Sequence, residues 1–444
     1  MTEPILSSEL AKASEATRAI LAATQDKLDT LRKIDPYLID LSLRENVFGA
    51  RVGQTLQDKL GILPKLRAFG FTNILLGTLD YAMPDEPEVD DDFMCYLRDN
   101  HIDMTGGFAF TNIGIVGDDG VFTPSISQQK LAAYCVPNTL HEIYLSDAGM
   151  SGLYDLATLQ RSLPVSIQWL NDNVVGDGGG RPRILINIVD GFDAFAQDPD
   201  RACAVLQQLA ALPIEGVSIE DDRGTFMPFQ VGGYVAVARS VLPPPLKIVV
   251  HMHTGGGFEN ASLIEALLSG ADGAWGGLPK RAAMIGHASM GELIANLVRV
   301  GNGNMQQYQL NQLLPLATAL QERDEEQVVP DDLPILGRNA YRLSASFFQQ
   351  RATRFMDLPP EAIGGTYHYR ICPIASDPPI IAGRLQEVTG EPIDSFPQAV
   401  LEQMVRLMRR ELRAGQRIVY DEPDQLRQLY QRAQGAVAKV NVNR

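Results

Sequence analysis

The 444-residue sequence predicts an α/β fold, a (β/α)8 TIM barrel with a helix before it and a mainly helical region after it. Between residues 37 and 300, short apolar runs alternate with loops and helical patterns, which is typical of a parallel sheet. Eight such units in about 260 residues match the size of a (β/α)8 barrel. A doubly wound open sheet is the alternative that gives the same local patterns.

Each predicted strand is a run of apolar or β-branched residues. These runs lie at 37–43, 72–78, 102–110, 142–146, 184–189, 216–220, 246–252 and 272–277. Residues 1–36 carry apolar side chains at helical spacing and predict an N-terminal helical extension to the barrel domain, 37–300. Residues 301–444 predict a mainly helical subdomain, in which 398–415 is an amphipathic helix that ends at a glycine.

Composition and charge narrow the class of protein. Apolar residues make up 45% and charged residues 21% of the chain, which is ordinary for a globular protein. The net charge of −16 argues against nucleic acid or an anionic membrane as the main partner. The four cysteines form no C-x-x-C pair, and there is neither a signal peptide nor an apolar run of about 18 residues. We therefore expect a cytoplasmic protein that acts on a small molecule.

The sequence "VVHMHTGGG" (249–257) carries the clearest chemical signal. His251 and His253 lie two residues apart at the end of a predicted strand, so their side chains point to the same face. In a (β/α)8 barrel, catalytic groups lie at the C-terminal ends of the strands. Such a pair can hold a metal ion, although two solvated polar residues at a strand end are the alternative.

Two other predicted strand ends contribute polar groups. The first strand ends in "DLSLREN", which contains Asp40, Arg44 and Glu45. The segment after the eighth contains Lys280, Arg281 and His287. Strands one, seven and eight are neighbours in a closed barrel, so a carboxylate and imidazoles from these ends predict a divalent metal site. His101 and His141 begin the third and fourth strand regions, where we expect structural roles.

These motifs together resemble the DRE-TIM metallolyases. "DLSLREN" is similar to their D-x-T-L-R-D/E-G motif, and "HMHTGGG" to their H-x-H-N-D-x-G motif. "IEDDRGTFMP" (219–228) resembles their D-T-x-G…P element, and "GADGAWGG…GHASMGEL" their G-A…G-N-A-S element. The resemblance covers residues 37–300 in the correct order. The family includes isopropylmalate and homocitrate synthases, HMG-CoA lyase and pyruvate-type carboxyltransferases, which make or break a C–C bond next to a carbonyl on a divalent metal.

The resemblance implies a role for each matching residue. Glu45, His251 and His253 match metal ligands, and His287 stands where many relatives have a ligating asparagine. The metal would be Zn, Mn or Mg. Arg44 matches the arginine that neutralises an enolate oxygen, and a guanidinium suits that task. Asp40 is expected to hold the first loop together. Lys280, Arg281 and Asp222 are expected to bind substrate. The two basic residues suit a carboxylate or a CoA phosphate, although a solvated loop is as good an interpretation of them.

Departures from the family pattern bear on the reaction. Leu278 replaces the loop cysteine of HMG-CoA lyases, and Glu220 replaces the modified lysine of carboxyltransferases. The segment "DLPILGRNAYRLSASFFQQ" (332–350) is similar to one that isopropylmalate-type synthases insert into a neighbouring subunit's site. Their acid–base histidine is absent, however, because Leu343 stands there, and Phe48 and Leu75 replace two further polar groups.

Three functions follow as alternatives. The first is a Claisen-type condensation of an acyl-CoA with a 2-oxo acid, by a homodimer, with a base that the sequence does not identify. The second is a lyase or aldolase that cleaves a hydroxy acid on the same metal site. The third is an inactive barrel that acts as a binding partner, which the lost polar residues motivate and the intact Glu45, His251 and His253 oppose.

Overall fold

The structure is a computed structural model that describes residues 15–44, 50–79, 86–280, 285–325, 329–349 and 358–442. Within them, eight parallel strands form a closed barrel in the order β1-β10-β9-β8-β7-β6-β3-β2. They are β1 (Tyr37–Asp40), β2 (Ile74–Thr78), β3 (Gly107–Asn112), β6 (Asn138–Ile143), β7 (Arg183–Ile188), β8 (Gly216–Asp221), β9 (Lys247–Met252) and β10 (Gly273–Gly276). The predicted (β/α)8 barrel is therefore confirmed, and the open sheet is excluded because β1 pairs with β10.

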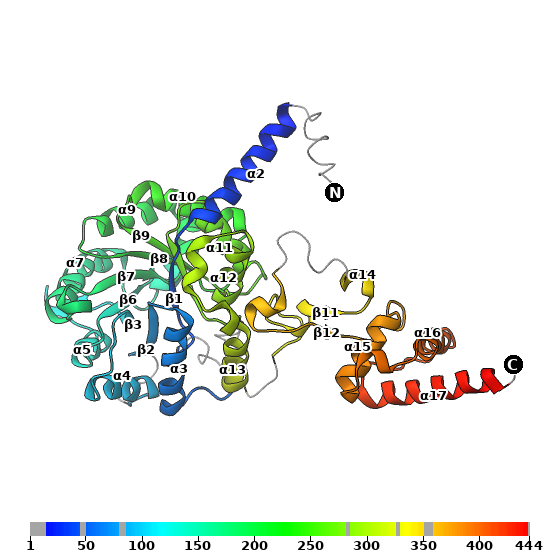
Figure 1. Cartoon of the computed structure of the whole chain (residues 1–444). Coiled ribbons are helices and arrows are strands. Elements are labelled where there is room, and N and C mark those ends of the chain that lie inside the picture. Colours follow the sequence, from blue (N-terminus) through cyan, green and yellow to red (C-terminus); the bar gives the residue numbers. More distant parts are fainter. Residues whose placement is uncertain are drawn as a thin grey trace. The chain divides into compact units, whose positions relative to one another are not determined.

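Helices cover the outside of the barrel (Figure 1). In chain order they are α3 (Leu56–Phe69), α4 (Val89–Asp99), α5 (Ile126–Ala133), α6 (Asp147–Met150), α7 (Leu156–Asn173), α8 (Gly191–Gln197), α9 (Pro199–Ala210), α10 (Pro228–Val241), α11 (Glu259–Leu268), α12 (Met290–Arg299) and α13 (Leu313–Glu325). Polar caps begin several of them. Thr55 and Asp58 form a capping box on α3, and Ser125 and Gln128 form one on α5. A small hairpin, β4 (Ile115–Val116) and β5 (Phe122–Thr123), follows β3.

The predicted N-terminal helix is α2 (Glu15–Lys33). Its last turn is tied to the barrel, because Asn302 donates hydrogen bonds to the carbonyls of Leu31 and Ile34. The rest of the helix is mainly exposed, including Ile20 and Leu21. No helix among the residues that the structure describes is long and apolar enough to cross a membrane.

The barrel interior is packed with large side chains. Its buried cluster consists of Ile39, Leu41, Leu75, Phe108, Phe110, Leu140, Leu185, Val249 and Trp275. Phe108 and Phe110 of β3 lie two residues apart because alternate residues of a strand face the same side, and the same spacing separates Ile39 of β1 from Leu41 just after it. Among the residues that the structure describes, the interior is therefore a packed core, and catalytic groups of such barrels lie above it, at the C-terminal ends of the strands.

Two predicted strands were placed wrongly. The third was predicted at 102–110 but forms at Gly107–Asn112, and the fourth was predicted at 142–146 but forms at Asn138–Ile143. The fourth begins with polar residues that are fully buried. Asn138 donates to the carbonyl of Gly107 and to Asp177, and Thr139 donates to the carbonyl of Ala109, so hydrogen bonds satisfy these polar groups.

His141 is consequently inside β6 rather than at its start. Its ring is fully buried, with Nδ1 2.8 Å from the hydroxyl of Thr111 and Nε2 3.0 Å from that of Ser166 on α7. It therefore lies between the barrel and its helices, away from the interior. The expected structural role fits this position.

The chain divides into two compact units, Met1–Val328 and Val329–Arg444. The first unit extends past residue 300 and includes the segment that ends in α13, whose Gln309 N–H donates to the carbonyl of Phe69 on α3. The second unit contains α14 (Ser346–Gln349), α15 (Pro378–Thr389), α16 (Gln398–Arg413) and α17 (Pro423–Val442), with a short parallel pair, β11 (Arg342–Leu343) and β12 (His368–Tyr369). It has its own buried cluster around Met404 and Leu426 and is mainly helical, as predicted.

Candidate metal and substrate site

Polar side chains replace the apolar core at the C-terminal ends of four neighbouring strands. Leu140, Leu185 and Val249 belong to the core, and two residues further along each strand the sequence becomes polar. The inward residues at this level are Glu142 on β6, Asn187 on β7, Glu220 on β8 and His251 on β9. Strand pairing places Glu142 beside Asn187 and Glu220 beside His251.

His251 is held by Trp275 on the neighbouring strand. The two rings stack with their centroids 3.6 Å apart, and Nδ1 of His251 lies 2.9 Å from the carbonyl oxygen of Trp275. Because a carbonyl can only accept, Nδ1 carries the proton and Nε2 carries the lone pair. The ring is fully buried, and Nε2 has no hydrogen-bond partner among the described residues. Burial lowers the pKa of His251 well below its usual value, which keeps the ring neutral.

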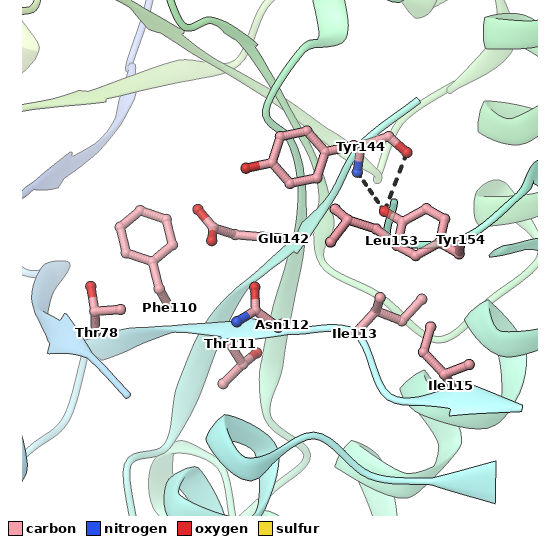
Figure 2. Close-up of a pocket in the computed structure, with 10 residues that line it drawn as sticks. All are labelled: Thr78, Phe110, Thr111, Asn112, Ile113, Ile115, Glu142, Tyr144, Leu153 and Tyr154. Carbon is pink, nitrogen blue, oxygen red and sulfur yellow. Dashed lines mark hydrogen bonds between the residues drawn. The ribbon is translucent and has the colours of Figure 1, made fainter. Parts of the chain in front are cut away.

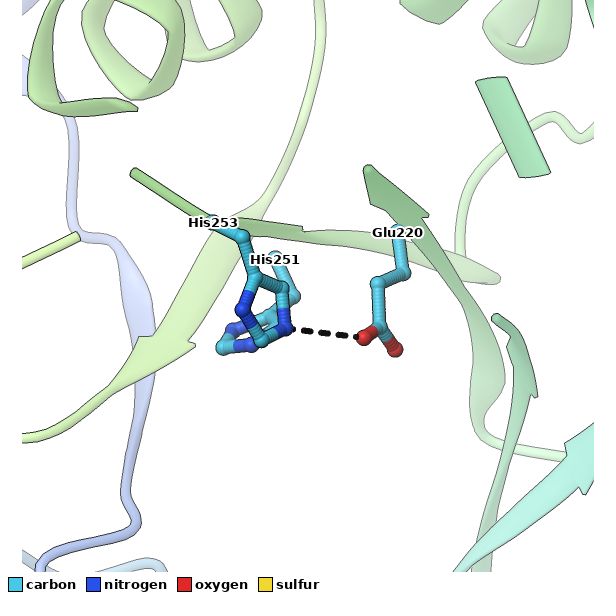
Figure 3. Close-up of side chains that lie close together, drawn as sticks. All are labelled: Glu220, His251 and His253. Carbon is cyan, nitrogen blue, oxygen red and sulfur yellow. Dashed lines mark hydrogen bonds and ion pairs between the residues drawn. The ribbon is translucent and has the colours of Figure 1, made fainter. Parts of the chain in front are cut away.

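His253 lies next to Glu220. Its Nε2 is 3.3 Å from Oε1 of Glu220, and the amide of Asn187 donates to Oε2 of the same carboxylate at 2.9 Å. One ligand atom from each of Glu220, His251 and His253 lies within 4.8 Å of the other two, and all three residues are buried. Figure 3 shows the three side chains converging from β8 and from the end of β9.

His287 adds a third imidazole beside this cluster. It forms a β-bridge with His253, and its ring centroid is 5.6 Å from that of His251. Nδ1 lies 3.0 Å from the carbonyl oxygen of Ala288, so the lone pair is again on Nε2, for which the described part of the chain offers no partner. Burial lowers the pKa of His287 to about 3. His287 is therefore a second neutral imidazole with a free lone pair, outside the tight cluster of three.

The backbone around His253 requires a glycine. Gly224 has φ +64, and a Cβ there would lie 1.9 Å from the carbonyl oxygen of His253. The carboxylate of Asp221 accepts hydrogen bonds from the backbone N–H groups of Gly224 and Phe226 and so fixes this loop. The "DDRG" sequence thus supports the backbone that presents His253.

Arg44 and Asp40 lie at the end of the first strand. Arg44 is nearly buried, its Nε donates to the hydroxyl of Thr78 at 2.6 Å, and its guanidinium lies 4.6 Å from the ring centroid of Phe110. Asp40 is fully buried and accepts two hydrogen bonds from Ser42, and the hydroxyl of Ser42 accepts one from the N–H of Leu278. Burial raises the pKa of Asp40 to about 7. Through Ser42, Asp40 therefore ties the loops after β1 and β10 together.

A cavity of about 420 Å³ lies beside Arg44. Thr78 and Phe110, both of which contact Arg44, line it. Its other lining residues come from β3, β4, β6 and the segment after β6: Thr111, Asn112, Ile113, Ile115, Glu142, Tyr144, Leu153 and Tyr154 (Figure 2). The cavity is thus at the end of the barrel where the histidines are.

The residues predicted to bind substrate have different surroundings in the structure. The ammonium of Lys280 is paired with the buried carboxylate of Glu259, so its charge is already matched inside the protein. Asp222 is half-buried near the cluster, and burial, with the charge of Glu220, raises its pKa to about 6. Glu45 and Arg281 lie outside the described residues, as does Phe48.

Sequence reasoning did not assign a role to Glu220 or to Glu142. Glu220 was noted only as a departure from the carboxyltransferases, and the misplaced fourth strand put Glu142 at a strand start. The signal for both was the period of two along each strand, which places Glu220 two residues after Ser218 and Glu142 two after Leu140.

Comparison with solved structures identifies this arrangement of strands and helices. An HMG-CoA lyase from Acinetobacter baumannii, solved with coenzyme A and 3-methylmalate, is 14% identical with a TM-score of 0.51, over 67% of this chain and 94% of its own. An HMG-CoA lyase from Bacillus subtilis is 15% identical with a TM-score of 0.54, over 72% of this chain and 98% of its own. The chain has the fold of the HMG-CoA lyases.

A third HMG-CoA lyase, from Pseudomonas aeruginosa, is 15% identical with a TM-score of 0.52, over 66% of this chain and 94% of its own. These lyases are among the enzymes that the sequence motifs resemble, so the expectation of fold from that resemblance is confirmed. No family model and no curated protein matches the sequence.

Proposed function

We propose that this chain is a divalent-metal-dependent enzyme of the DRE-TIM type, which makes or breaks a C–C bond next to a carbonyl. The form we favour is the condensation of an acyl-CoA with a 2-oxo acid through an enolate. The observation that carries the proposal is the pair of buried, neutral imidazoles, His251 and His287, whose Nε2 lone pairs have no partner within the described residues.

The residues present fit a metal. An unpaired buried nitrogen is costly, and a metal-binding histidine commonly donates its other N–H to a backbone carbonyl, as His251 and His287 do. Glu220 supplies a carboxylate next to His253, so the donor set is nitrogen and oxygen, which suits Zn, Mn or Mg. We assign His251, His253 and Glu220 as ligands, with His287 as a further one. Glu45 is the ligand that the motif "DLSLREN" adds.

A bound divalent ion supplies a Lewis acid that polarises a substrate carbonyl. The chain's own contribution at the oxygen that becomes negative is Arg44. Its guanidinium is fixed by the hydroxyl of Thr78 and by the ring of Phe110, so it needs little rearrangement when charge develops. Asp40 and Ser42 hold the loop that carries it.

Cleavage on the same site is the second candidate. The HMG-CoA lyase with coenzyme A and 3-methylmalate at this fold supports it, since that enzyme breaks the kind of bond that a synthase makes. Against it, this chain has Leu278 in place of the lyases' loop cysteine, and Leu278 is fully buried. We therefore favour condensation.

The test is a two-way activity screen. Acyl-CoA thioesters are combined with 2-oxo acids, with release of free CoA thiol as the readout, and the products are then offered for cleavage. Thiol release that depends on both substrates and on added metal supports condensation. Cleavage without condensation supports the second candidate. Metal-replete protein that does neither contradicts the proposed function.

A further inference from the structure

The cavity beside Arg44 contains a carboxylate that the proposed function has not used. Glu142 lies on β6, two residues after the core residue Leu140, so its side chain points to the inside of the barrel. Among the residues that line the cavity, it is the one with an acidic side chain. Figure 2 shows its carboxylate directed toward the side on which Phe110 and Thr78 lie. Both of these residues contact Arg44.

The surroundings of Glu142 suit proton transfer near neutral pH. Burial raises the pKa of Glu142 to about 7, the charge of Glu220 raises it further, and Arg44 and the amide of Asn187 oppose this. Its aromatic neighbour Tyr144 has a pKa raised to about 12 by burial. Glu142 can therefore gain and lose a proton at the pH at which a base must operate, and Tyr144 stays protonated.

The other polar groups near the cavity have different tasks. The hydroxyl of Tyr154 accepts from the N–H of Tyr144 and donates to its carbonyl, so it is engaged with the backbone. Thr78 accepts from Arg44. The far end of the cavity is apolar, with Ile113, Ile115 and Leu153. An apolar wall of this kind suits the uncharged part of a carbon acid and keeps water away from a carboxylate base.

We propose that Glu142 is the base that removes the proton from the carbon acid, and the acid that returns it in the reverse direction. The carboxylate of Glu142 takes a proton from the carbon next to the substrate carbonyl. The C–H electron pair becomes the C=C bond of the enolate, and the carbonyl π pair moves to the oxygen beside Arg44. Glu142 is left as a neutral carboxyl. This inference rests on the proposed function and names the base that the sequence did not identify.

The test follows the exchange of substrate C–H hydrogens for solvent deuterium by NMR, which needs no second substrate. The probes are acetyl-CoA, propionyl-CoA, pyruvate and 2-oxobutyrate, each with metal-loaded enzyme. Wild-type exchange should rise with pH through about 7, because only the ionised carboxylate is a base. Glu142→Gln should lower the rate by at least about 100-fold and remove that pH dependence. Glu142→Asp should recover part of the rate.

Glu292→Gln is the matched control. Glu292 on α12 is also buried with a pKa raised to about 7, but it does not line the cavity. It should keep the wild-type rate, while metal content and thermal unfolding report on the fold of every variant. Equal exchange in wild type and Glu142→Gln would overturn this inference and leave the proposed function standing. Metal-loaded wild type that exchanges none of the probes would overturn both.

Discussion

A backbone carbonyl decides the chemistry of His251. The backbone oxygen of Trp275 accepts a hydrogen bond from Nδ1 of His251, so Nδ1 carries the proton and Nε2 carries the lone pair. His251 is one of the polar residues that follow the apolar core at the C-terminal ends of the strands. His287 uses the carbonyl of Ala288 in the same way. In both rings a backbone carbonyl selects the tautomer with its lone pair on Nε2, and burial keeps both rings neutral. Packing alone does not explain this shared arrangement, whereas metal binding does.

Arg44 should not tolerate replacement by lysine. Arg44→Lys keeps the positive charge but loses the planar fork that bonds Thr78 and stacks on Phe110, so the charge is no longer fixed beside the developing oxyanion. We expect turnover to fall by about 100-fold or more, with metal content unchanged. Steady-state kinetics with elemental analysis checks this. Activity close to that of wild type would remove Arg44 from the mechanism.

His141 should make the stability of the protein depend on pH. Burial lowers the pKa of His141 to about 3, against about 6.5 in an unfolded chain. Its stabilising contribution is therefore complete above pH about 6.5 and is lost as the pH falls toward 3, by up to about 1.4 kcal/mol per pH unit, because only the unfolded chain takes up the proton.

The measurement is urea unfolding of wild type and His141→Gln at several pH values between about 7 and 5. The difference in free energy of unfolding should shrink as the pH falls. Groups that both proteins share, such as Asp40, cancel in this difference. A difference that stays constant with pH would mean that His141 is not kept neutral in the fold.

One glycine in the loop after β8, Gly224, allows the backbone of that loop to pass close to His253. Gly224 passes so close to the carbonyl of His253 that no side chain fits. Gly224→Ala should therefore displace the backbone of His253 and weaken metal binding. The matched control is Gly178→Ala. Gly178 has a similar φ of +65 but open space around it, so this variant carries only the backbone strain, about 1 kcal/mol.

Metal titration of the two glycine variants separates the effect of the steric contact with the carbonyl of His253 from the effect of backbone strain at a positive φ. Loss of affinity in Gly224→Ala with normal affinity in Gly178→Ala is the expected result. Equal affinities would show that the 224 loop does not position His253.

The strands show which parts of the fold the sequence pattern predicts and which it does not. Apolar runs such as "LKIVVHM" predicted β9 nearly residue for residue, because its buried positions are apolar. β6 was misplaced because it opens with Asn138 and Thr139, whose polarity suggests a loop. Their hydrogen bonds to Gly107, Ala109 and Asp177 are contacts across the fold, which a single sequence does not display.

The candidate site was also predicted only in part, because some of its contacts join strands that are distant in the sequence. His251, His253 and His287 were predicted together because strand order in a closed barrel makes their strands neighbours. Glu220 was not predicted as their partner. Its role depends on the pairing that sets it beside His251 and on the amide of Asn187 from β7, and neither follows from spacing along the chain.

The second compact unit, 329–444, contains the segment that resembles the synthases' inter-subunit segment, so we can predict how two chains assemble. We propose a homodimer in which the segment 332–350 lies near the partner's Arg44 and His251, as the resemblance to synthases implies. The exposed Ile20 and Leu21 of α2 are further candidates for burial between chains. Light scattering at micromolar concentration should give the mass of a dimer, and a monomer would contradict this.

Two truncations test the division of the chain. Ending the chain at residue 328 keeps the whole first unit, so we expect a folded barrel that binds metal but neither dimerises fully nor turns over substrate. Ending it at residue 300 also removes the buried Tyr308, Leu313 and Leu320, which pack with the barrel, and should lower its stability sharply. Full activity of the 328-residue protein would exclude a role for the second unit in catalysis.

The most direct test of a metal-dependent enzyme is the metal content of the purified protein, measured by elemental analysis beside His251→Ala and Glu220→Gln. We predict about one divalent ion per wild-type chain, loss of that ion in His251→Ala, and weaker retention in Glu220→Gln because a neutral amide is a poorer ligand. His287→Ala then shows whether His287 is a ligand, by whether metal content falls. Equal metal content in wild type and His251→Ala, or no metal in wild type even after incubation with Zn, Mn or Mg, would contradict the account.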